Sequence, residues 1–340
     1  MRETRLFSEK EIEEAANLLK QGELVAFPTE TVYGLGADGL NPMAVAKIFQ
    51  VKGRPQDNPL ILHVSGREQV ERIAECPENA MALMETFWPG PLTIVLRAKP
   101  IVPEIVRAGL PSVGVRMPDH PVALDLIRAA NRPLAAPSAN RSGKPSPTSA
   151  AHVWQDLGGR IAGIIDGGPA RIGIESTVVD LSVDPPLVLR PGAISSDRLQ
   201  RELRGKLNVW RLSRAPEGQP SPGLRYRHYA PEAKLDWLQE EGAEHIARAL
   251  SLDGERHGYL AHGFASRTLN ENMLQLAAEY PQKLVFIPLG DTMEEIAAGL
   301  YQALRESDRL QLDRLWVARL PEVGMGRAIM DRLQRAMFKQ

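Results

Sequence analysis

The chain has very little cysteine, no excess of positive charge and no long apolar run. Cys76 is the single cysteine among 340 residues, so neither an internal disulfide nor a cysteine metal cluster can form. Lys and Arg number 41 against 42 Asp and Glu, whereas a protein held to nucleic acid by bulk charge usually has a basic excess. Acidic residues near the start are unlike a signal peptide, and no apolar run approaches ~18 residues. We therefore expect a cytoplasmic protein that does not enter a membrane.

The sequence also lacks the G-x-x-x-x-G-K-[ST] loop that cradles nucleotide phosphates. "GLGADG" (34–39) does have the G-x-G-x-x-G spacing of a dinucleotide-binding loop, in which the first glycine directly follows a strand and the last opens a helix. Here Pro28 ends the strand, "TETVY" precedes Gly34, and "ADGLN" separates the glycines from a helix capped by Asn41. We therefore predict a loop in which Gly34 and Gly36 let the backbone approach a small ligand, and no dinucleotide site.

The length and the element pattern predict two domains. Residues 1–210 mix helical patterns with more numerous short strands, which predicts an α/β domain with a mixed sheet. Residues 211–231 contain prolines 216, 220, 222 and 231 and have the composition of an extended, semi-stiff linker. Residues 232–340 alternate strand and helix, which predicts a smaller, Rossmann-like domain with a parallel, doubly wound sheet.

Local signals place several helix ends. Ser8 with Glu11 has the pattern of a capping box, and Asn41 before Pro42 has that of a helix start. Near the end of the chain, "EVGMGRAIMDRLQRA" (322–336) predicts a packed helix with a basic outer face.

The polar segments of the first domain carry the candidate site. In "KGRPQDNPL" (52–60), prolines keep Lys52 and Arg54 on an extended segment. Two such cations can engage two phosphate oxygens at once, Arg as a fork and Lys as a point charge. Taken alone, such a pair of cations is more often part of a solvated basic loop, and the further polar segments downstream weaken that interpretation.

Further downstream, "APSANRSGKPSP" (136–147) combines hydroxyls, an amide and cations at a turn, a composition that favours an anion-binding nest. Arg116 and Arg190 end two predicted strands. Together these segments predict a site for a polyanion and a small polar molecule.

Five motifs occur along the chain in this order: "FPTETVYGLG", "KGRPQDNPL", "APSANRSGKPSPT", "IESTVVDL" and "LRPGAI". They resemble the YrdC-domain family, the threonylcarbamoyl-AMP synthases, whose K-x-R…S-x-N signature matches Lys52, Arg54, Ser138 and Asn140. "SPGLRYRHYAP" and the α/β tail resemble the long form of that family. The likeness covers nearly the whole chain and implies a YrdC-like twisted sheet around a deep positive cavity.

The resemblance implies an ATP-dependent nucleotidyltransferase. L-threonine, bicarbonate and ATP would give L-threonylcarbamoyladenylate and pyrophosphate, the first step of threonylcarbamoyladenosine modification of tRNAs that read ANN codons. A separate tRNA threonylcarbamoyl transferase complex would receive the product, and direct tRNA binding is possible but not required. Mg²⁺ would enter with ATP, held mostly by phosphates and water, because no pair of acidic side chains stands out as a metal site.

The matching motifs also imply individual roles. Lys52 and Arg54 would be catalytic, stabilising charge on the phosphoryl oxygens. Threonine would be held by Thr31, His63, Arg116 and Ser176. ATP would be held by Lys52, Arg54, Asn58, Ser112, Ser138, Asn140, Ser146 and Arg190, and Tyr229 of the linker, with Arg227 or His228, would fold back over the nucleotide. A linker that closed in this way would exclude water from the hydrolysable intermediates.

Two other functions are compatible with part of the pattern. A positive cavity could accept an RNA backbone, although the even charge balance and the missing basic–aromatic stripe argue against an RNA-binding module. Carbamoyltransferases that use carbamoyl phosphate contain related domains, but they are embedded in larger chains with zinc-finger and acylphosphatase segments. Neither segment occurs here.

Overall fold

The computed structural model describes residues 3–204, 208–209, 229–239, 242–252 and 254–337. The chain forms two compact units, Met1–Ser142 with Ser146–Tyr226 and Gly143–Pro145 with Arg227–Gln340. Of the linker predicted at 211–231, only residues 229–231 are described, so the rest of that prediction lies outside the described residues.

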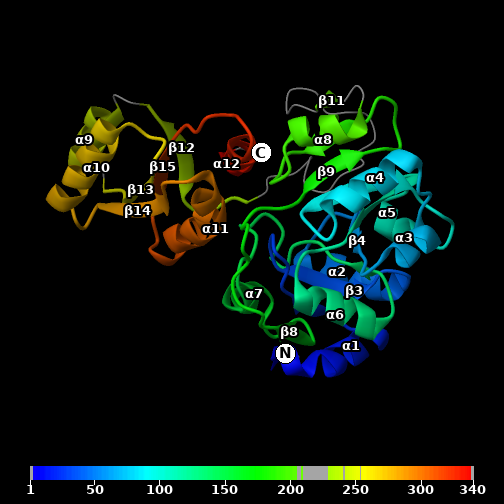
Figure 1. The fold of residues 1–340 in the computed structure, drawn as a ribbon. Helices are drawn as coiled ribbons and strands as arrows, with labels where there is room; N and C mark the ends of the chain where they lie inside the picture. The colour runs from blue at the N-terminus through cyan, green and yellow to red at the C-terminus, as the bar shows by residue number, and fades with distance from the viewer. Residues whose placement is uncertain (1–2, 205–207, 210–228, 240–241, 253, 338–340) are drawn as a thin grey trace. The chain divides into compact units, whose positions relative to one another are not determined.

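The first unit is built on a mixed eleven-stranded sheet ordered β1-β8-β2-β3-β7-β4-β6-β5-β9-β10-β11 (Figure 1). Its strands are β1 Arg5–Phe7, β2 Val25–Phe27, β3 Gly34–Asp38, β4 Ile61–His63, β5 Leu92–Arg97, β6 Ser112–Arg116, β7 Leu134–Ala135, β8 Gly163–Ile165, β9 Thr177–Asp180, β10 Leu187–Arg190 and β11 Asn208–Val209. β4 runs parallel to β6 and antiparallel to β7. The mixed sheet predicted from the strand-rich pattern is confirmed.

The helices of this unit are η1 Glu9–Glu11, α1 Ile12–Lys20, α2 Pro42–Lys52, α3 Arg67–Ile73, α4 Glu78–Phe87, α5 Glu104–Arg107, α6 Pro121–Ala130, α7 Ala150–Leu157 and α8 Ser196–Leu203. The Ser8–Glu11 capping box forms. The Asn41 side chain accepts hydrogen bonds from the first turn of α2, so this helix start is confirmed too. Lys52 is consequently the last residue of a capped helix.

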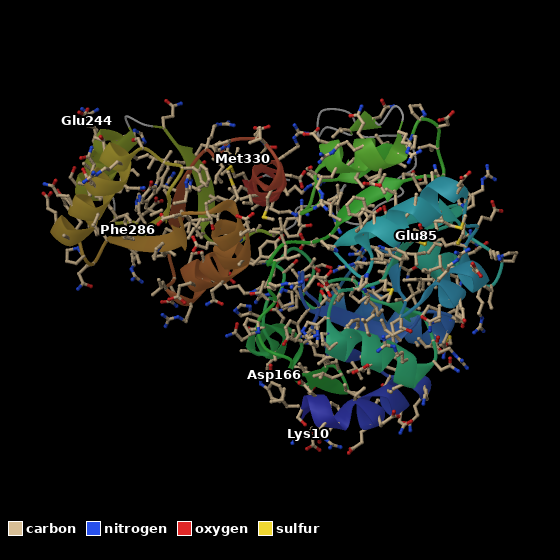
Figure 2. All side chains as sticks on the ribbon, in the orientation of Figure 1. Lys10, Glu85, Asp166, Glu244, Phe286 and Met330 are labelled. Atoms are coloured by element: carbon tan, nitrogen blue, oxygen red, sulfur yellow. The ribbon has the colours of Figure 1, made fainter. Side chains whose placement is uncertain are left out.

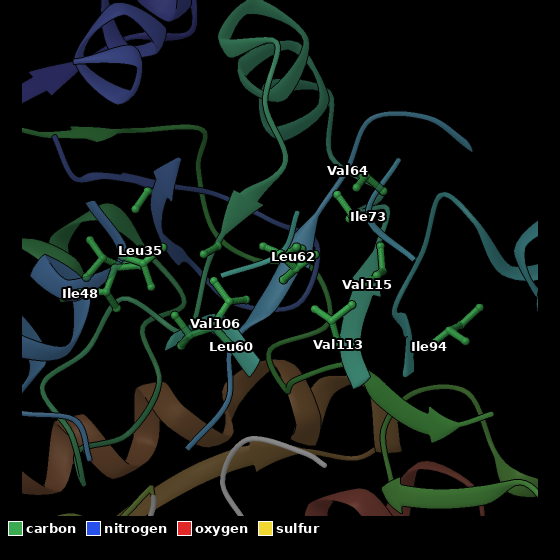
Figure 3. Close-up of a cluster of buried hydrophobic side chains, with 14 of the residues drawn as sticks. Leu35, Ile48, Leu60, Leu62, Val64, Ile73, Ile94, Val106, Val113 and Val115 are labelled. Carbon is green, nitrogen blue, oxygen red and sulfur yellow. The ribbon is translucent and has the colours of Figure 1, made fainter. Parts of the chain in front are cut away.

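Helices cover both faces of the sheet. The main core lies on the face that carries Leu62, Val64, Val113 and Val115, and Figure 3 shows these residues with Ile48 of α2. On the other face, α1 and α6 pack side by side against β2. Charged residues such as Lys10, Glu85 and Glu244 are exposed on the outside of the helical segments of their units (Figure 2).

The glycine-rich stretch is a strand, which corrects the predicted loop. Gly34–Asp38 is β3, antiparallel to β2, so the rejection of a dinucleotide loop is confirmed. A Cβ on Gly36 would lie 2.9 Å from Phe27 Cε1 and 3.1 Å from Val25 O. Gly36 is therefore required for packing against a phenylalanine ring and a neighbouring strand.

The second unit has the predicted alternation. Its elements are β12 Lys234–Leu238, α9 Gly242–Leu252, β13 His257–His262, α10 Arg267–Glu279, β14 Leu284–Gly290, α11 Met293–Arg309, β15 Arg314–Ala318 and α12 Met325–Met337. The strands form one parallel sheet ordered β12-β15-β13-β14, which confirms the parallel Rossmann-like sheet. No helix in the described part of the chain is long and apolar enough to cross a membrane.

The basic outer face predicted for the last helix is wrong. Arg332 and Arg335 are 0% and 3% exposed. Asp331 forms ion pairs with both guanidinium groups, at 2.8 and 2.9 Å. These arginines are buried because a carboxylate in the same helix compensates their charge.

Candidate functional site

A row of polar side chains lies on the face of the first sheet opposite the main core. Side chains alternate between the faces of a strand, so the inward Val113 and Val115 of β6 place Arg116 on the opposite face. His63 ends β4 and is the register partner of Arg116. Thr93 of β5 is on this face as well, between the core residues Leu92 and Ile94. The strand pairing thus brings together residues that are far apart in the sequence.

Arg116 and Glu30 form a buried ion pair in this row. Arg116 Nη2 lies 2.6 Å from Glu30 Oε2, and the two side chains are 5% and 1% exposed. Arg116 Nε also donates to the Gly90 carbonyl at 3.4 Å. A buried charge requires such compensation, which each side chain of the pair gives the other.

His63 next to Arg116 is held neutral. Burial, followed by the charge of Arg116, lowers the pKa of His63 to about 3. Its Nδ1 is buried, and no hydrogen-bonding partner for it occurs among the described residues. A neutral imidazole has one donor and one acceptor nitrogen. It can therefore donate a hydrogen bond to a ligand hydroxyl or accept one from it.

Ser176 extends the row towards β10. Its Oγ lies 2.8 Å from Thr93 Oγ1 and accepts a hydrogen bond from Arg190 Nη2 at 3.1 Å, while Arg190 Nε donates to its carbonyl at 3.0 Å. Ser176 was predicted to hold threonine and Arg190 to hold ATP. The structure brings these two residues into direct contact.

Lys52 joins the two halves of the K-x-R…S-x-N signature. Its Nζ donates to the Ser138 carbonyl at 2.5 Å and also to the carbonyl of Asn140, residues 86 and 88 positions further along the chain. The Asn140 Oδ1 accepts from Ser138 Oγ at 2.5 Å. Lys52 is 4% exposed, so its charge lies inside the fold.

The remaining predicted ATP ligands lie in separate groups. Arg54 donates to the backbone carbonyls of Asn58 and Pro59 at 3.3 and 3.0 Å. Ser146 donates to Glu175 Oε1 at 2.6 Å, next to Ser176 in the chain. Ser112 begins β6, about 13 Å of strand from Arg116 at its other end. Within the described residues, no side-chain hydrogen bond or ion pair joins Ser112 to the other candidates.

Two further predicted ligands lie elsewhere in the first and second units. Thr31 is fully buried beside Glu30, and its Oγ1 lies 2.9 Å from Thr29 Oγ1. Tyr229 belongs to the second unit, where its ring stacks on Tyr301 with centroids 5.4 Å apart. Arg227 and His228 lie outside the described residues, so the lid predicted there stays a prediction.

Two carboxylates in the site received no role from the sequence. Glu30 pairs with Arg116 and Glu175 with Ser146. The available signal was their position inside the motifs "PTETVY" and "GIESTV", where acidic residues alternate with hydroxyls. That signal does not reveal which cation or hydroxyl each carboxylate reaches, because those partners are set by strand pairing.

Hydroxyls, backbone carbonyls and cations are among the polar groups of the candidate site. Within the described ranges, no three His, Cys, Asp or Glu side chains gather in a way that could hold a metal. The site instead offers hydroxyls, carbonyls and cations, which suit phosphate groups, while Mg²⁺ commonly keeps phosphate and water ligands.

Comparisons with known proteins cover both units. A family model described as telomere recombination (Sua5, YciO and YrdC) matches residues 17–192, and one described as threonylcarbamoyl-AMP synthase, C-terminal domain, matches residues 194–337. The threonylcarbamoyl-AMP synthase of Bacillus subtilis is 46% identical over 334 residues, covering 97% of this chain and 93% of the relative. That of Pyrococcus abyssi is 45% identical over 332 residues, covering 95% and 92%.

A solved structure agrees with these relatives. The crystal structure of P. abyssi Sua5 complexed with L-threonine superposes with a TM-score of 0.87 at 42% identity and covers 98% of each chain. The similarity therefore extends over nearly the whole chain and through both units.

Proposed function

The chain belongs to the threonylcarbamoyl-AMP synthase family, and on that premise we propose which of its residues hold each substrate. The family activity is the ATP-dependent formation of L-threonylcarbamoyladenylate for tRNA modification, a nucleotidyl transfer. An RNA-binding module is not favoured, because the relatives that cover nearly the whole chain are synthases.

The ATP site is centred on Lys52. The single observation that carries this assignment is the contact of Lys52 Nζ with the backbone of Ser138 and Asn140, which brings together the two signature segments. The nearby Arg54 offers a planar fork and Lys52 a point charge, a combination suited to a chain of phosphates. The other proposed ATP ligands are Asn58, Ser112, Ser146, Arg190 and Tyr229.

Threonine is placed on the His63–Arg116 row. Arg116 can bind the threonine carboxylate through two parallel charge-assisted hydrogen bonds. The neutral His63 and the hydroxyls of Thr31 and Ser176 complete the proposed site. Support comes from the Arg190–Ser176 contact, because it places the proposed threonine and ATP ligands side by side.

The chemistry requires no nucleophilic side chain. The threonine amine and bicarbonate combine to a carbamate, whose oxygen attacks the α-phosphorus while pyrophosphate leaves. Negative charge grows on the phosphoryl oxygens, where preorganised Lys52 and Arg54 stabilise it. Mg²⁺ bound to ATP supplies further charge neutralisation when the substrate is present.

The partners beyond threonine and ATP are proposals as well. Bicarbonate is the carbon source, and the adenylate passes to a tRNA threonylcarbamoyl transferase complex. We place the reaction in the cytoplasm, where ATP and tRNA are both available. The linker between the two units would exclude water from the carbamate and the mixed anhydride.

The test is pyrophosphate release by the purified chain with ATP and Mg²⁺. Release is expected only when L-threonine and bicarbonate are both present, and Arg54→Ala is expected to reduce it at least a hundredfold, the scale on which a charge-stabilising group acts. Arg128→Ala is the matched control, because Arg128 is an exposed arginine of α6 that forms a surface ion pair with Asp125. Release without threonine, or an unchanged rate in Arg54→Ala, contradicts the proposal.

A further inference from the structure

Glu30 is a buried carboxylate whose hydrogen-bonding capacity is not used by the described residues. The side chain is 1% exposed, and neither oxygen receives a hydrogen bond of good geometry from that part of the chain. Among the described residues it forms an ion pair with Arg116, at 2.6 Å. Buried carboxylates are normally surrounded by donors, so this one is built for a donor that comes from elsewhere.

The surroundings hold Glu30 in place. The Ile172 amide donates to the Glu30 carbonyl at 2.7 Å, which anchors its backbone between Thr29 and Thr31. The half-buried His120 also faces this carboxylate, and burial lowers the pKa of His120. Arg116 is thus the permanent cation opposite Glu30, and both belong to the row in which the proposed function places threonine.

Threonine is a zwitterion, and a guanidinium–carboxylate pair matches its two charges. We propose that Glu30 binds the ammonium group of threonine, while Arg116 binds the carboxylate, and that Glu30 accepts the proton which the ammonium must lose. This inference rests on the proposed function. Without substrate, the two side chains neutralise each other, which limits the cost of burying them. When threonine enters, its ammonium group replaces Arg116 as the partner of Glu30, and its carboxylate replaces Glu30 as the partner of Arg116. The net charge of the site stays the same.

The proton has a defined place in the reaction. R–NH₃⁺ and HCO₃⁻ give R–NH–COO⁻, H₂O and one H⁺; the C–N bond forms and a C–O bond of bicarbonate breaks with loss of water. Only the deprotonated nitrogen has the lone pair that attacks carbon. A carboxylate in contact with the ammonium can take up the released proton without a further co-reactant.

The test compares two ligands without ATP: L-threonine and 2,3-dihydroxybutanoate, in which a hydroxyl replaces the amine. The wild type is expected to bind threonine at least tenfold more tightly. Glu30→Gln is expected to weaken threonine binding about tenfold to a hundredfold, the scale of a charge-assisted hydrogen bond. The same variant is expected to bind the deaminated ligand equally well or better, because the competing carboxylate is gone. An equal loss for both ligands would show a structural role only and overturn the proposal.

Steady-state kinetics tests whether Glu30 accepts the proton from the threonine ammonium group. Glu30→Gln is expected to lower kcat at saturating threonine, and Glu30→Asp to restore part of it, because a carboxylate returns. An unchanged kcat in Glu30→Gln overturns proton acceptance. Glu68→Gln is the matched control, because Glu68 is exposed on α3.

Further measurements distinguish a failure of this inference from misfolding of the variant and from a failure of the proposed function. Retained ATP binding shows that a variant is folded. If Glu30→Gln does not fold, the test is the wild type's affinity for L-threonine compared with its affinity for 2,3-dihydroxybutanoate. Equal affinities overturn the proposal. Absence of threonine-dependent pyrophosphate release by the wild type contradicts the proposed function, whatever the two ligands show.

Discussion

Replacing His63 should remove a measurable part of the acid sensitivity of the first unit. The pKa of His63 is lowered to about 3 by burial and by Arg116, whereas an unfolded histidine has a pKa near 6.5. Between these two values the unfolded chain binds a proton that the folded chain does not. The free energy of unfolding therefore falls as the pH falls below about 6.5, by about 1.4 kcal/mol per pH unit, and it levels off near pH 3.

The expected size follows from this pKa difference. From pH 7.0 to 5.0 the wild type should lose about 2 kcal/mol through His63 alone, because the folded imidazole stays neutral at both pH values. In His63→Asn the side chain cannot titrate, so this part of the loss should disappear. Other titrating groups contribute equally to both proteins and cancel in the comparison.

The assay must report the first unit alone, because a two-domain chain does not unfold in one step. Urea-dependent amide exchange, read by mass spectrometry on peptides from β4 and β6, measures the local free energy of opening. His245→Asn is the matched control: His245 is exposed on α9 of the second unit, so the wild-type pH dependence should be retained. Equal losses in wild type and His63→Asn would refute the argument that His63 is desolvated and neutral.

Three further substitutions test separate contacts. Gly36→Ala should cost about 1–3 kcal/mol in the same exchange assay, because its Cβ would overlap the Phe27 ring; an unchanged stability would show that the ring can move. Ser176→Ala should lower the stability of β9 by about 1–3 kcal/mol by removing its bonds to Thr93 and Arg190, and should raise the KM for threonine more than that for ATP. Asp331→Asn should destabilise the second unit by about 3 kcal/mol, measured by exchange in α12, because buried guanidinium groups lose their counter-charge; a small effect would mean that other groups compensate them.

The local features of this protein could be predicted from its amino-acid sequence. The Ser8–Glu11 box and the Asn41 cap depend on residues within one turn, so they can be recognised from the sequence and occur in the structure. The alternation of strand and helix after residue 232 is also visible along the chain, and it predicted the parallel sheet. The ordered motifs around Lys52 and Ser138 indicated the family, since each is a short contiguous pattern.

Strand pairing and packing set the remaining features, which could not be predicted from the sequence. Gly34–Asp38 is a strand because β2 and β7 pair with it on either side, and glycine-rich sequence alone has a low strand propensity. The Glu30–Arg116 pair exists because β6 ends beside a segment that lies more than 80 residues earlier in the chain. Arg332 is buried because Asp331 neutralises it inside a packed helix. Strand pairing supplies the partners of β3 and of Glu30, and no local pattern encodes them. For Arg332 the carboxylate is a neighbour in the sequence, but the burial of both groups depends on how α12 packs.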